Sequence, residues 1–242
     1  MQETYYTGTY WGARRETAAE CAQRAAAFLQ GLAACDPSFQ HWYQPGRTPR
    51  GLPGRPLPSD DLRELEAFML RGRNRTDFGH HVIEELGFSG TFWNGRKNSA
   101  LVSTVCGSSS PHTSNLCVMN LPSRGEPFER LVCASVLARV LTCMVTAWDP
   151  DWGVATSGPL RDLVSDKGRV GTFAGWLTYI SRRRGTVPPL PAPARIEPVG
   201  THGTLVILMP ERPTVSTPEH VESLSRLQRL LDGAGLLTPV AQ

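Results

Sequence analysis

Residues 128–147 read FERLVCASVLARVLTCMVTA, and this long apolar stretch decides the fold. Its charged side chains are few: Glu129, Arg130 and Arg139. A helix with apolar residues around most of its circumference is buried on most sides. The stretch therefore predicts a central helix over residues 128–147 that packs on a sheet.

Three strands are predicted on the C-terminal side of this helix. Residues 172–181, TFAGWLTYIS, are rich in aromatic and β-branched side chains, which favour strands. Residues 194–199 and 203–209 pair as a hairpin. The second of these, GTLVILM, is continuously apolar, which is typical of a central strand covered on both faces. A last helix begins at Thr217, with Pro218 in the first helical position that proline favours.

The N-terminal half predicts one strand, two helices and a meander. Residues 3–11, ETYYTGTYW, form the strand because β-formers dominate them. The helix after it begins with a capping box made by Thr17 and Glu20. A shorter helix is expected at residues 60–71, capped by Ser59. The antiparallel meander comprises residues 88–94, 100–106 and 115–121.

Strands that come in groups between helices favour an α+β domain, with a mixed or mainly antiparallel sheet and helices packed on it. A chain of 242 residues is long enough for one such core, since it can bury roughly 70% of its unfolded surface. Residues 44–58, QPGRTPRGLPGRPLP, are too rich in Pro and Gly for a helix or a central strand. They predict a surface loop and not a domain boundary. The whole chain, 1–242, is therefore predicted to be a single domain.

The charge balance and the lack of targeting signals restrict the function. The formal net charge is +3, from 25 basic and 22 acidic residues, which argues against an overall mimic of nucleic acid. The sequence begins without the basic and apolar regions of a secretory signal. No stretch approaches the roughly 18 apolar residues of a transmembrane helix. The cysteines form no C-x-x-C pair, which indicates reduced thiols. We therefore expect a cytoplasmic protein.

The sequence contains none of the common catalytic or nucleotide-binding motifs. The G-x-S-x-G, G-x-x-x-x-G-K-[ST] and G-x-G-x-x-G patterns are all missing. His80 and His81 with Glu84 and Glu85 are the best metal candidates, since His81 and Glu85 would share one face of a helix. Two ligands do not make a site, however, and a solvated helix edge is the simpler interpretation. We therefore expect no catalytic residue, no metal and no cofactor.

Two groups of arginines are the features that would favour a nucleic-acid-binding regulator. They are Arg182, Arg183 and Arg184 on one side and Arg71, Arg73 and Arg75 on the other. Together they could form a phosphate-binding surface. A strand that ends in three arginines is more often a solvated edge that discourages pairing with another sheet. An enzyme whose site is assembled from distant residues is the other alternative that the sequence leaves open.

The most distinctive local pattern is Trp148-Asp149-Pro150-Asp151-Trp152. Two carboxylates beside an exposed indole would suit a basic protein partner, because aromatic anchors contribute much of the energy of an interface. The same pattern also fits the C-terminus of a helix, with one Trp packed beneath it and Asp151 shaping a turn. The second interpretation, in which the pattern ends a helix, describes the more common arrangement.

Several strings resemble the immunity protein 52 family, in the expected order and over nearly the whole chain. They are ETYYTGTYWGARRE at 3–16 with the helix ECAQRAAAFL at 20–29, FWNG at 92–95, AWDPDWG at 147–153, GWLTYISRRRG at 175–185, VPPLPAPARIEPVGTHGTLVIL at 187–208 and PEHVESLSRLQRLL at 218–231. The resemblance implies a bacterial antidote in the cytoplasm. Such antidotes are encoded beside toxins with a restriction-endonuclease-like domain, some of them delivered by contact-dependent or type VI secretion.

The resemblance implies a protein that binds and neutralises a cognate nuclease toxin, without contact to nucleic acid, membrane or a small-molecule substrate. It assigns no catalytic residue. Because the net charge is small, inhibition must use a local patch. A nuclease cleft is usually electropositive, so carboxylates in loops or on short helices are the expected contacts. The candidate partner-binding residues are Asp149, Asp151 and Trp152, followed by Asp60, Asp61 and Glu64.

Overall fold

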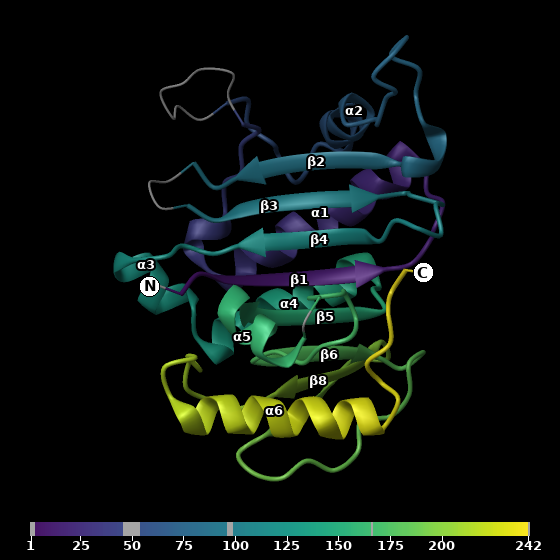
Figure 1. Ribbon diagram of the computed structural model, residues 1–242. Helices are drawn as coiled ribbons and strands as arrows, with labels where there is room; N and C mark the ends of the chain where they lie inside the picture. Colours follow the sequence, from purple (N-terminus) through teal and green to yellow (C-terminus); the bar gives the residue numbers. More distant parts are fainter. Residues whose placement is uncertain (1–2, 46–53, 96–98, 166, 242) are drawn as a thin grey trace.

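One antiparallel sheet of eight strands runs through the computed structural model, which describes residues 3–45, 54–95, 99–165 and 167–241. The strand order is β2-β3-β4-β1-β5-β6-β8-β7 (Figure 1). The strands are β1 (Tyr5–Trp11), β2 (Phe88–Trp93), β3 (Leu101–Cys106), β4 (Asn115–Asn120), β5 (Trp152–Ser157), β6 (Leu177–Ser181), β7 (Arg195–Val199) and β8 (Gly203–Ile207). The buried apolar residues form one cluster around this sheet, so the predicted α+β fold with a mainly antiparallel sheet is confirmed.

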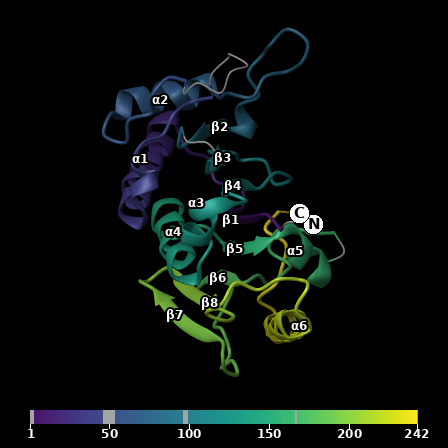
Figure 2. The same ribbon diagram turned by 90° about the vertical axis from the view of Figure 1, so that its left-hand side faces the viewer.

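Helices cover both faces of the sheet, but not evenly (Figures 1 and 2). One face carries α1 (Ala18–Cys35), α2 (Leu62–Arg71), α3 (Gly125–Leu131) and α4 (Ala134–Trp148). The opposite face carries α5 (Gly158–Val164) and α6 (Pro218–Gly233). Two short 3₁₀ turns, Pro37–Phe39 and Glu84–Leu86, complete the described helical elements. The central strands are therefore covered on both sides, and β5 and β6 are buried along their whole length.

The start of α1 follows the predicted capping box. Thr17 Oγ1 accepts from the Glu20 N–H at 3.2 Å, and Glu20 Oε2 accepts from the Thr17 N–H at 2.7 Å. The start of α2 differs, because Asp61 and not Ser59 is the N-cap. Its carboxylate accepts from the Glu64 N–H at 3.0 Å, and an ionised oxygen is a stronger acceptor there than a hydroxyl.

The stretch at 128–147 forms two helices, so the prediction of one continuous helix is wrong. The axes of α3 and α4 differ by 70°. A helix of 15 residues such as α4 is about 22 Å long, which matches strands of six or seven residues. A straight continuation would extend beyond the sheet. The bend instead brings Phe128 back to the ring of Tyr5, with ring centroids 6.2 Å apart.

No single described helix is long and apolar enough to cross a membrane, although the bent pair α3 and α4 meets those criteria when taken together.

Strand β5, which the sequence did not indicate, lies beside β1 near the middle of the sheet. Its sequence, WGVATS, is rich in small residues because its neighbours approach closely. A Cβ on Gly153 would lie 3.0 Å from Thr9 Cγ2. The predicted strand at 172–181 begins only at Leu177. A Cβ on Gly175 would lie 2.3 Å from Val154 Cγ2, and its N–H donates to Thr178 Oγ1 at 3.0 Å, which favours a turn.

The hairpin of β7 and β8 and the meander of β2, β3 and β4 are confirmed. However, β8 is next to the edge strand and is not central. It is apolar because α4 packs on it and α6 lies on the other side (Figure 2). Of the predicted loop at 44–58, residues 46–53 lie outside the described residues, and Leu57 is buried.

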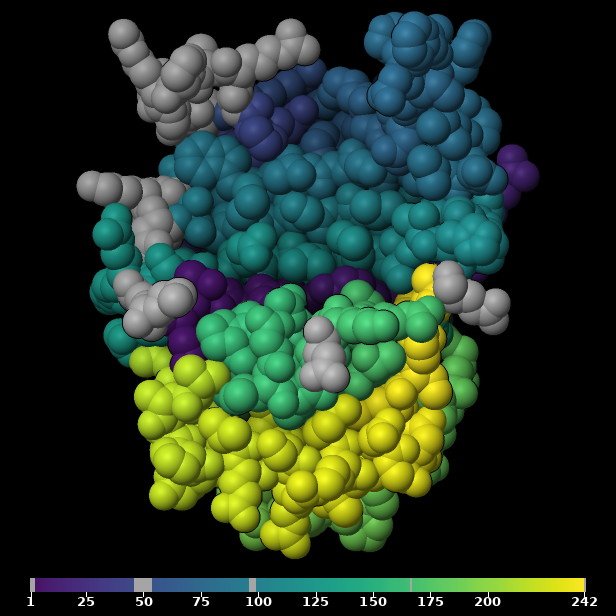
Figure 3. All heavy atoms as spheres, in the orientation of Figure 1, coloured from purple at the N-terminus to yellow at the C-terminus, as the bar shows by residue number. Residues whose placement is uncertain are grey.

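None of the described helices covers the face of β2, β3 and β4 away from α1 (Figures 1 and 2), and Figure 3 shows the molecule from this side. Burial alternates along β3, where Val102 and Thr104 are buried and Ser103 and Val105 are half-buried. The register places the side chains on this face, which are half-buried except for the exposed Asn120, in adjacent rows across the three strands. We call this surface the open sheet face; it comprises Ser89, Thr91, Trp93, Leu101, Ser103, Val105, Leu116, Val118 and Asn120.

Candidate partner-binding surfaces

The Asp149–Asp151 turn connects α4 to β5. Asp149 is the C-cap of α4 in the left-handed conformation, with φ 46° and ψ 60°, and its N–H donates to the Val145 carbonyl at 2.9 Å. A short polar side chain tolerates this conformation better than most. Asp151 attaches the turn to the sheet, because its Oδ2 accepts from the Gly12 N–H at 2.9 Å and its own N–H donates to the Tyr10 carbonyl at 3.0 Å.

Arg183 binds both carboxylates of this turn. Its Nη1 donates to Asp149 Oδ2 at 3.0 Å, and its Nε donates to Asp151 Oδ1 at 3.1 Å. Its Nη2 donates to the carbonyl oxygens of Asp149 and Pro150 at 3.0 and 3.1 Å. His202 Nδ1 lies 3.2 Å from Asp149 Oδ1. The acceptor oxygens of the turn are therefore largely engaged within the protein.

The charge of the turn is balanced by two arginines. Burial would raise the pKa of Asp149, but hydrogen bonds from His202 and Arg183 outweigh this effect and lower the pKa below its ordinary value. Arg14 adds a second guanidinium, which donates to the carbonyl of Trp148 at 2.8 Å. A hollow of about 200 Å³ lies between these groups and the end of β1. Its two aspartates face two arginines, so it is not an acidic patch.

Trp152, the expected aromatic anchor, is fully buried in the core. Its ring lies 4.9 Å from that of Phe173 and 5.6 Å from that of Tyr10, centroid to centroid. The indole therefore cannot contact a partner while the protein is folded. The Trp-acid pattern is therefore partly structural, because its Trp152 is buried beside the turn that ends α4.

The second acidic group, Asp60, Asp61 and Glu64, lies at the start of α2. The carboxylate of Glu64 is only 15% exposed and pairs with Arg55 at 2.7 Å and Arg71 at 3.1 Å. Asp60 and Asp61 are exposed. Within the described part of the chain, Asp60 has no hydrogen-bond or ion-pair partner. It is thus the most available carboxylate of the six predicted residues.

The sheet order keeps the two acidic groups apart, and likewise the two arginine groups. The Asp149–Asp151 turn precedes β5 in the middle of the sheet, whereas α2 packs on α1 and β2 at one end. The two acidic groups are therefore not brought together. The two arginine groups are also apart, because four strands lie between β2 and β6. Arg184 is bound internally, with Nη1 donating to the carbonyl of Thr238 at 2.8 Å.

The segment from Arg73 to Ile83 forms a hydrogen-bonded hairpin and not a helix, so the predicted helix edge at His80 and His81 is wrong. Gly79 has φ 74° and His80 has φ 50°, which a helix does not accommodate. Among the described residues, no group of three or more His, Cys, Asp or Glu side chains is placed to hold a metal ion.

Phe78, at the tip of this hairpin, is the residue that the sequence analysis missed. Its side chain is 94% exposed, whereas the next most exposed large apolar residue, Leu163, is 49% exposed. The signal in the sequence is weak but present: one aromatic side chain stands alone in the polar run RNRTDFGHH, next to a glycine. A helix or a strand with a buried face would contain a second apolar residue at its own spacing.

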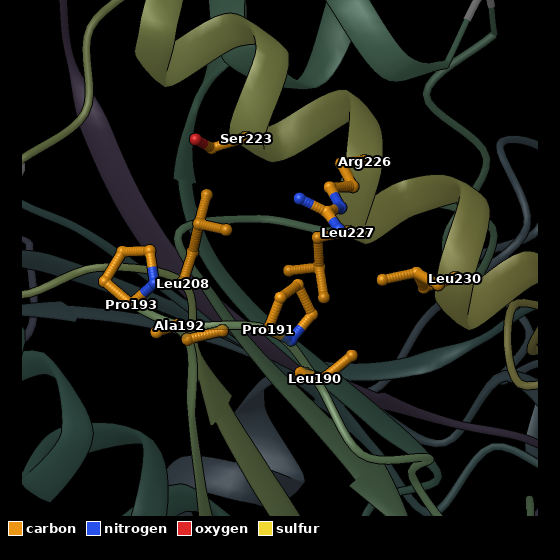
Figure 4. Close-up of a pocket in the computed structure, with 10 residues that line it drawn as sticks. Leu190, Pro191, Ala192, Pro193, Leu208, Ser223, Arg226, Leu227 and Leu230 are labelled. Atoms are coloured by element: carbon orange, nitrogen blue, oxygen red, sulfur yellow. The ribbon is translucent and has the colours of Figure 1, made fainter.

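The hollows of the surface differ in size and polarity. The small groove between residues 190–194 and α6 is lined by Leu, Pro and Ala side chains together with Ser223 and Arg226, and it has a volume of about 50 Å³ (Figure 4). Pockets that bind metabolites are usually about 300–1,000 Å³, so this groove accommodates a side chain at most. A larger hollow of about 420 Å³ lies between the start of α1 and β2. Two of its carboxylates are engaged, Glu16 with Arg24 and Glu20 with Thr17.

An antiparallel sheet of eight strands with helices packed unevenly on its two faces defines an α+β protein. The chain belongs to the immunity protein 52 family, whose model matches residues 3–240. No curated protein sequence matches it. Among solved structures it is similar to the Pseudomonas aeruginosa T6SS protein PA0821, with a TM-score of 0.53 and 12% identity over 94% of this chain and 72% of the other. That likeness shows the fold.

Proposed function

We propose that this protein is the antidote of a secreted bacterial nuclease toxin and neutralises it by forming a tight, non-covalent, stoichiometric complex. The observation that carries this proposal is the family match, which spans residues 3–240 and therefore the whole sheet. The antidote acts in the cytoplasm of the producing cell, without catalysis and without a cofactor. It contacts the toxin protein and leaves nucleic acid, membrane and small molecules unbound.

The structural neighbour supports a proposal about how the toxin is delivered. A protein of the same fold is described as a type VI secretion system protein, so the toxin of this chain is proposed to be delivered by such a system. This is an antidote for competition between neighbouring bacteria, where the producing cell must neutralise the toxin that its kin deliver.

A carboxylate patch is proposed to attract the electropositive cleft of the toxin during association. Of the two acidic groups, the start of α2 is favoured because Asp60 and Asp61 are exposed. Asp149 and Asp151 share the guanidinium of Arg183, and a partner would have to displace it. Charges at the rim of an interface mainly raise the association rate.

The test is co-expression with the toxin domain encoded beside this gene. The chain should restore growth to cells that make the active toxin, and it should co-purify at a 1:1 ratio with a toxin whose nuclease residues have been inactivated. An empty vector is the control for growth. If the chain neither restores growth nor co-purifies, the proposed function fails. A mobility shift of plain DNA by the chain alone would instead favour a nucleic-acid-binding regulator, and turnover of a substrate by the chain alone would favour an enzyme.

A further inference from the structure

The open sheet face is a continuous, uncharged surface. One row runs across the three strands through Ser89, Val105 and Leu116, which are directly opposite one another in the register. Such cross-strand neighbours have side chains on the same face of the sheet. The next row places Thr91 beside Ser103 and Val118, and the row after that places Trp93 beside Leu101 and Asn120.

None of these residues carries a charge, although 19% of the chain is charged. The solvated face of an antiparallel sheet is usually polar, and charged side chains on it discourage association. Here apolar side chains predominate at half-exposed positions, with hydroxyl and amide groups between them. A surface of this composition matches an uncharged partner surface, because a charged one would lose its hydration without gaining a counter-charge.

The Phe78 hairpin and α5 border this face. In Figure 2 the hairpin between α2 and β2 projects to the same side of the sheet as α5 and α6. Figure 1 shows it beside β2, whereas α5 lies beyond β1. The hairpin, whose Phe78 is 94% exposed, and α5, whose Leu163 is 49% exposed, therefore project from the same side of the sheet as the open sheet face.

The hairpin holds Phe78 in place before any partner arrives. The Thr76 N–H donates to the His81 carbonyl at 2.9 Å, and the Ile83 N–H donates to the Asn74 carbonyl at 2.9 Å. Thr76 Oγ1 donates to the Phe78 carbonyl at 2.6 Å. Preorganisation lowers the entropy that an interface loses on binding. A non-glycine residue with positive φ, His80, stands next to the tip, and such strain is concentrated at ligand-binding loops.

We infer that the open sheet face, together with Phe78, is the surface that docks the toxin domain. This inference rests on the proposed function and specifies the partner surface: an uncharged, largely apolar patch with a pocket that receives one aromatic ring. Such a patch differs from a phosphate-binding cleft, which is electropositive. The toxin is therefore held mainly outside its catalytic cleft, and the complex blocks access of the substrate by its bulk.

The experiment measures binding of the full-length chain to the nuclease-inactivated toxin domain by calorimetry. Phe78→Ser should raise the Kd about 30-fold, as expected for an interfacial aromatic hot spot. Val105→Arg should raise it about 100-fold or more, because it places an unpaired charge on β3, the middle strand of the face. The matched control is Ile196→Arg on the edge strand β7, an aliphatic side chain that is 41% exposed; its Kd should change less than threefold.

Hydrogen–deuterium exchange of the unmodified chain makes the test independent of folding defects. Binding should slow exchange at residues 88–93, 101–106 and 115–120 and in the Phe78 hairpin. If the unmodified chain binds but protection is confined to residues 60–64 or 149–151, or if Phe78→Ser and Val105→Arg bind as tightly as the unmodified chain, the inference is wrong while the proposed function stands. The inference is also wrong if the unmodified chain co-sediments with anionic lipid vesicles and Phe78→Ser does not, while Phe78→Ser keeps its affinity for the toxin. That result would show that the hairpin binds a membrane. Failure of the unmodified chain to bind the toxin at all refutes both.

Discussion

Arg183 holds Asp149 in the left-handed conformation that ends α4, with Nη1 donating to the carboxylate and Nη2 donating to the carbonyl oxygen of the same residue, each at 3.0 Å. The two contacts fix both the side chain and the backbone of the cap. Asp149 therefore helps to hold the end of α4 in place. A partner could contact only those atoms of Asp149 that Arg183 leaves accessible.

Loss of Arg183 should therefore lower stability. Arg183→Ala removes the donors for Asp149 and Asp151, and we expect the free energy of unfolding to fall by about 1–2 kcal/mol, a range that allows for solvent screening. The matched control is Arg182→Ala at the neighbouring exposed position, where the change should stay within about 0.5 kcal/mol. Urea denaturation followed by circular dichroism measures both. Equal effects of the two substitutions would contradict the role of Arg183.

Glu3 should make stability depend on pH. Burial would raise its pKa, but hydrogen bonds from Thr214, Ser157 and other donors outweigh this and lower the pKa. A lowered pKa in the folded state contributes stability above the ordinary value of about 4.3, and the contribution is lost as the pH falls through the lowered value. Glu3→Gln should cost about 1–2 kcal/mol at pH 7.

The difference between Glu3→Gln and the unmodified chain should shrink as the pH falls below about 4. Thermal unfolding between pH 7 and pH 3 measures it. Glu219→Gln on the exposed first turn of α6 is the control, with a small effect throughout. A stability difference for Glu3→Gln that stays constant down to pH 3 would show that its carboxylate is not stabilised in the folded state.

Truncation of two aromatic residues should have very different effects on stability. Trp152→Ala removes a fully buried ring and should lower the free energy of unfolding by about 3–5 kcal/mol. Phe78→Ala removes a ring that contacts almost nothing and should leave it within about 0.5 kcal/mol. Differential scanning calorimetry compares their Tm values. A large loss of Tm for Phe78→Ala would mean that the ring packs within the chain.

Charge reversal at the start of α2 should alter the rate of toxin binding. Asp60→Lys leaves the N-cap at Asp61 intact, so folding should be unaffected. If the toxin cleft faces this surface, the association rate should fall several-fold at low salt and recover as salt is added, because exposed charges act through screened steering. Glu219→Lys, on a distant helix, is the control. Surface plasmon resonance gives the rates, and an association rate that is unchanged at low salt would remove Asp60 from the interface.

The elements with local signals follow from the sequence. Thr17 and Glu20 specify the start of α1 through contacts three residues apart, and the alternation of β3 reflects a sheet with one covered face. The elements that depend on distant neighbours do not. Position 153 in β5 is a glycine because Thr9 leaves little room for a larger side chain. The break between α3 and α4 follows from the length of the sheet.

The candidate sites were harder to predict because exposure is a tertiary property. The sequence shows that Trp152 and two aspartates are adjacent, but not that the indole points into the core beside Phe173. It shows the arginines after β6, but not that Arg183 turns back to the end of α4. Phe78 is exposed because the hairpin projects from the sheet, and the register that forms the open sheet face links residues that are far apart in the sequence, such as Ser89 and Leu116.

The central place of β1 determines the order in which this chain can assemble. Tyr10 pairs with Leu116 on one edge and Tyr5 pairs with Ser157 on the other. Strand β1 thus waits for segments that are translated much later, and pairings over such distances form slowly. Until residue 157 has emerged, at least one edge of an apolar strand lacks its partner, which is a state prone to aggregation. Nascent chains that stop before this point should therefore need a chaperone, and rapid folding of the sheet can begin only after most of the chain has been synthesised.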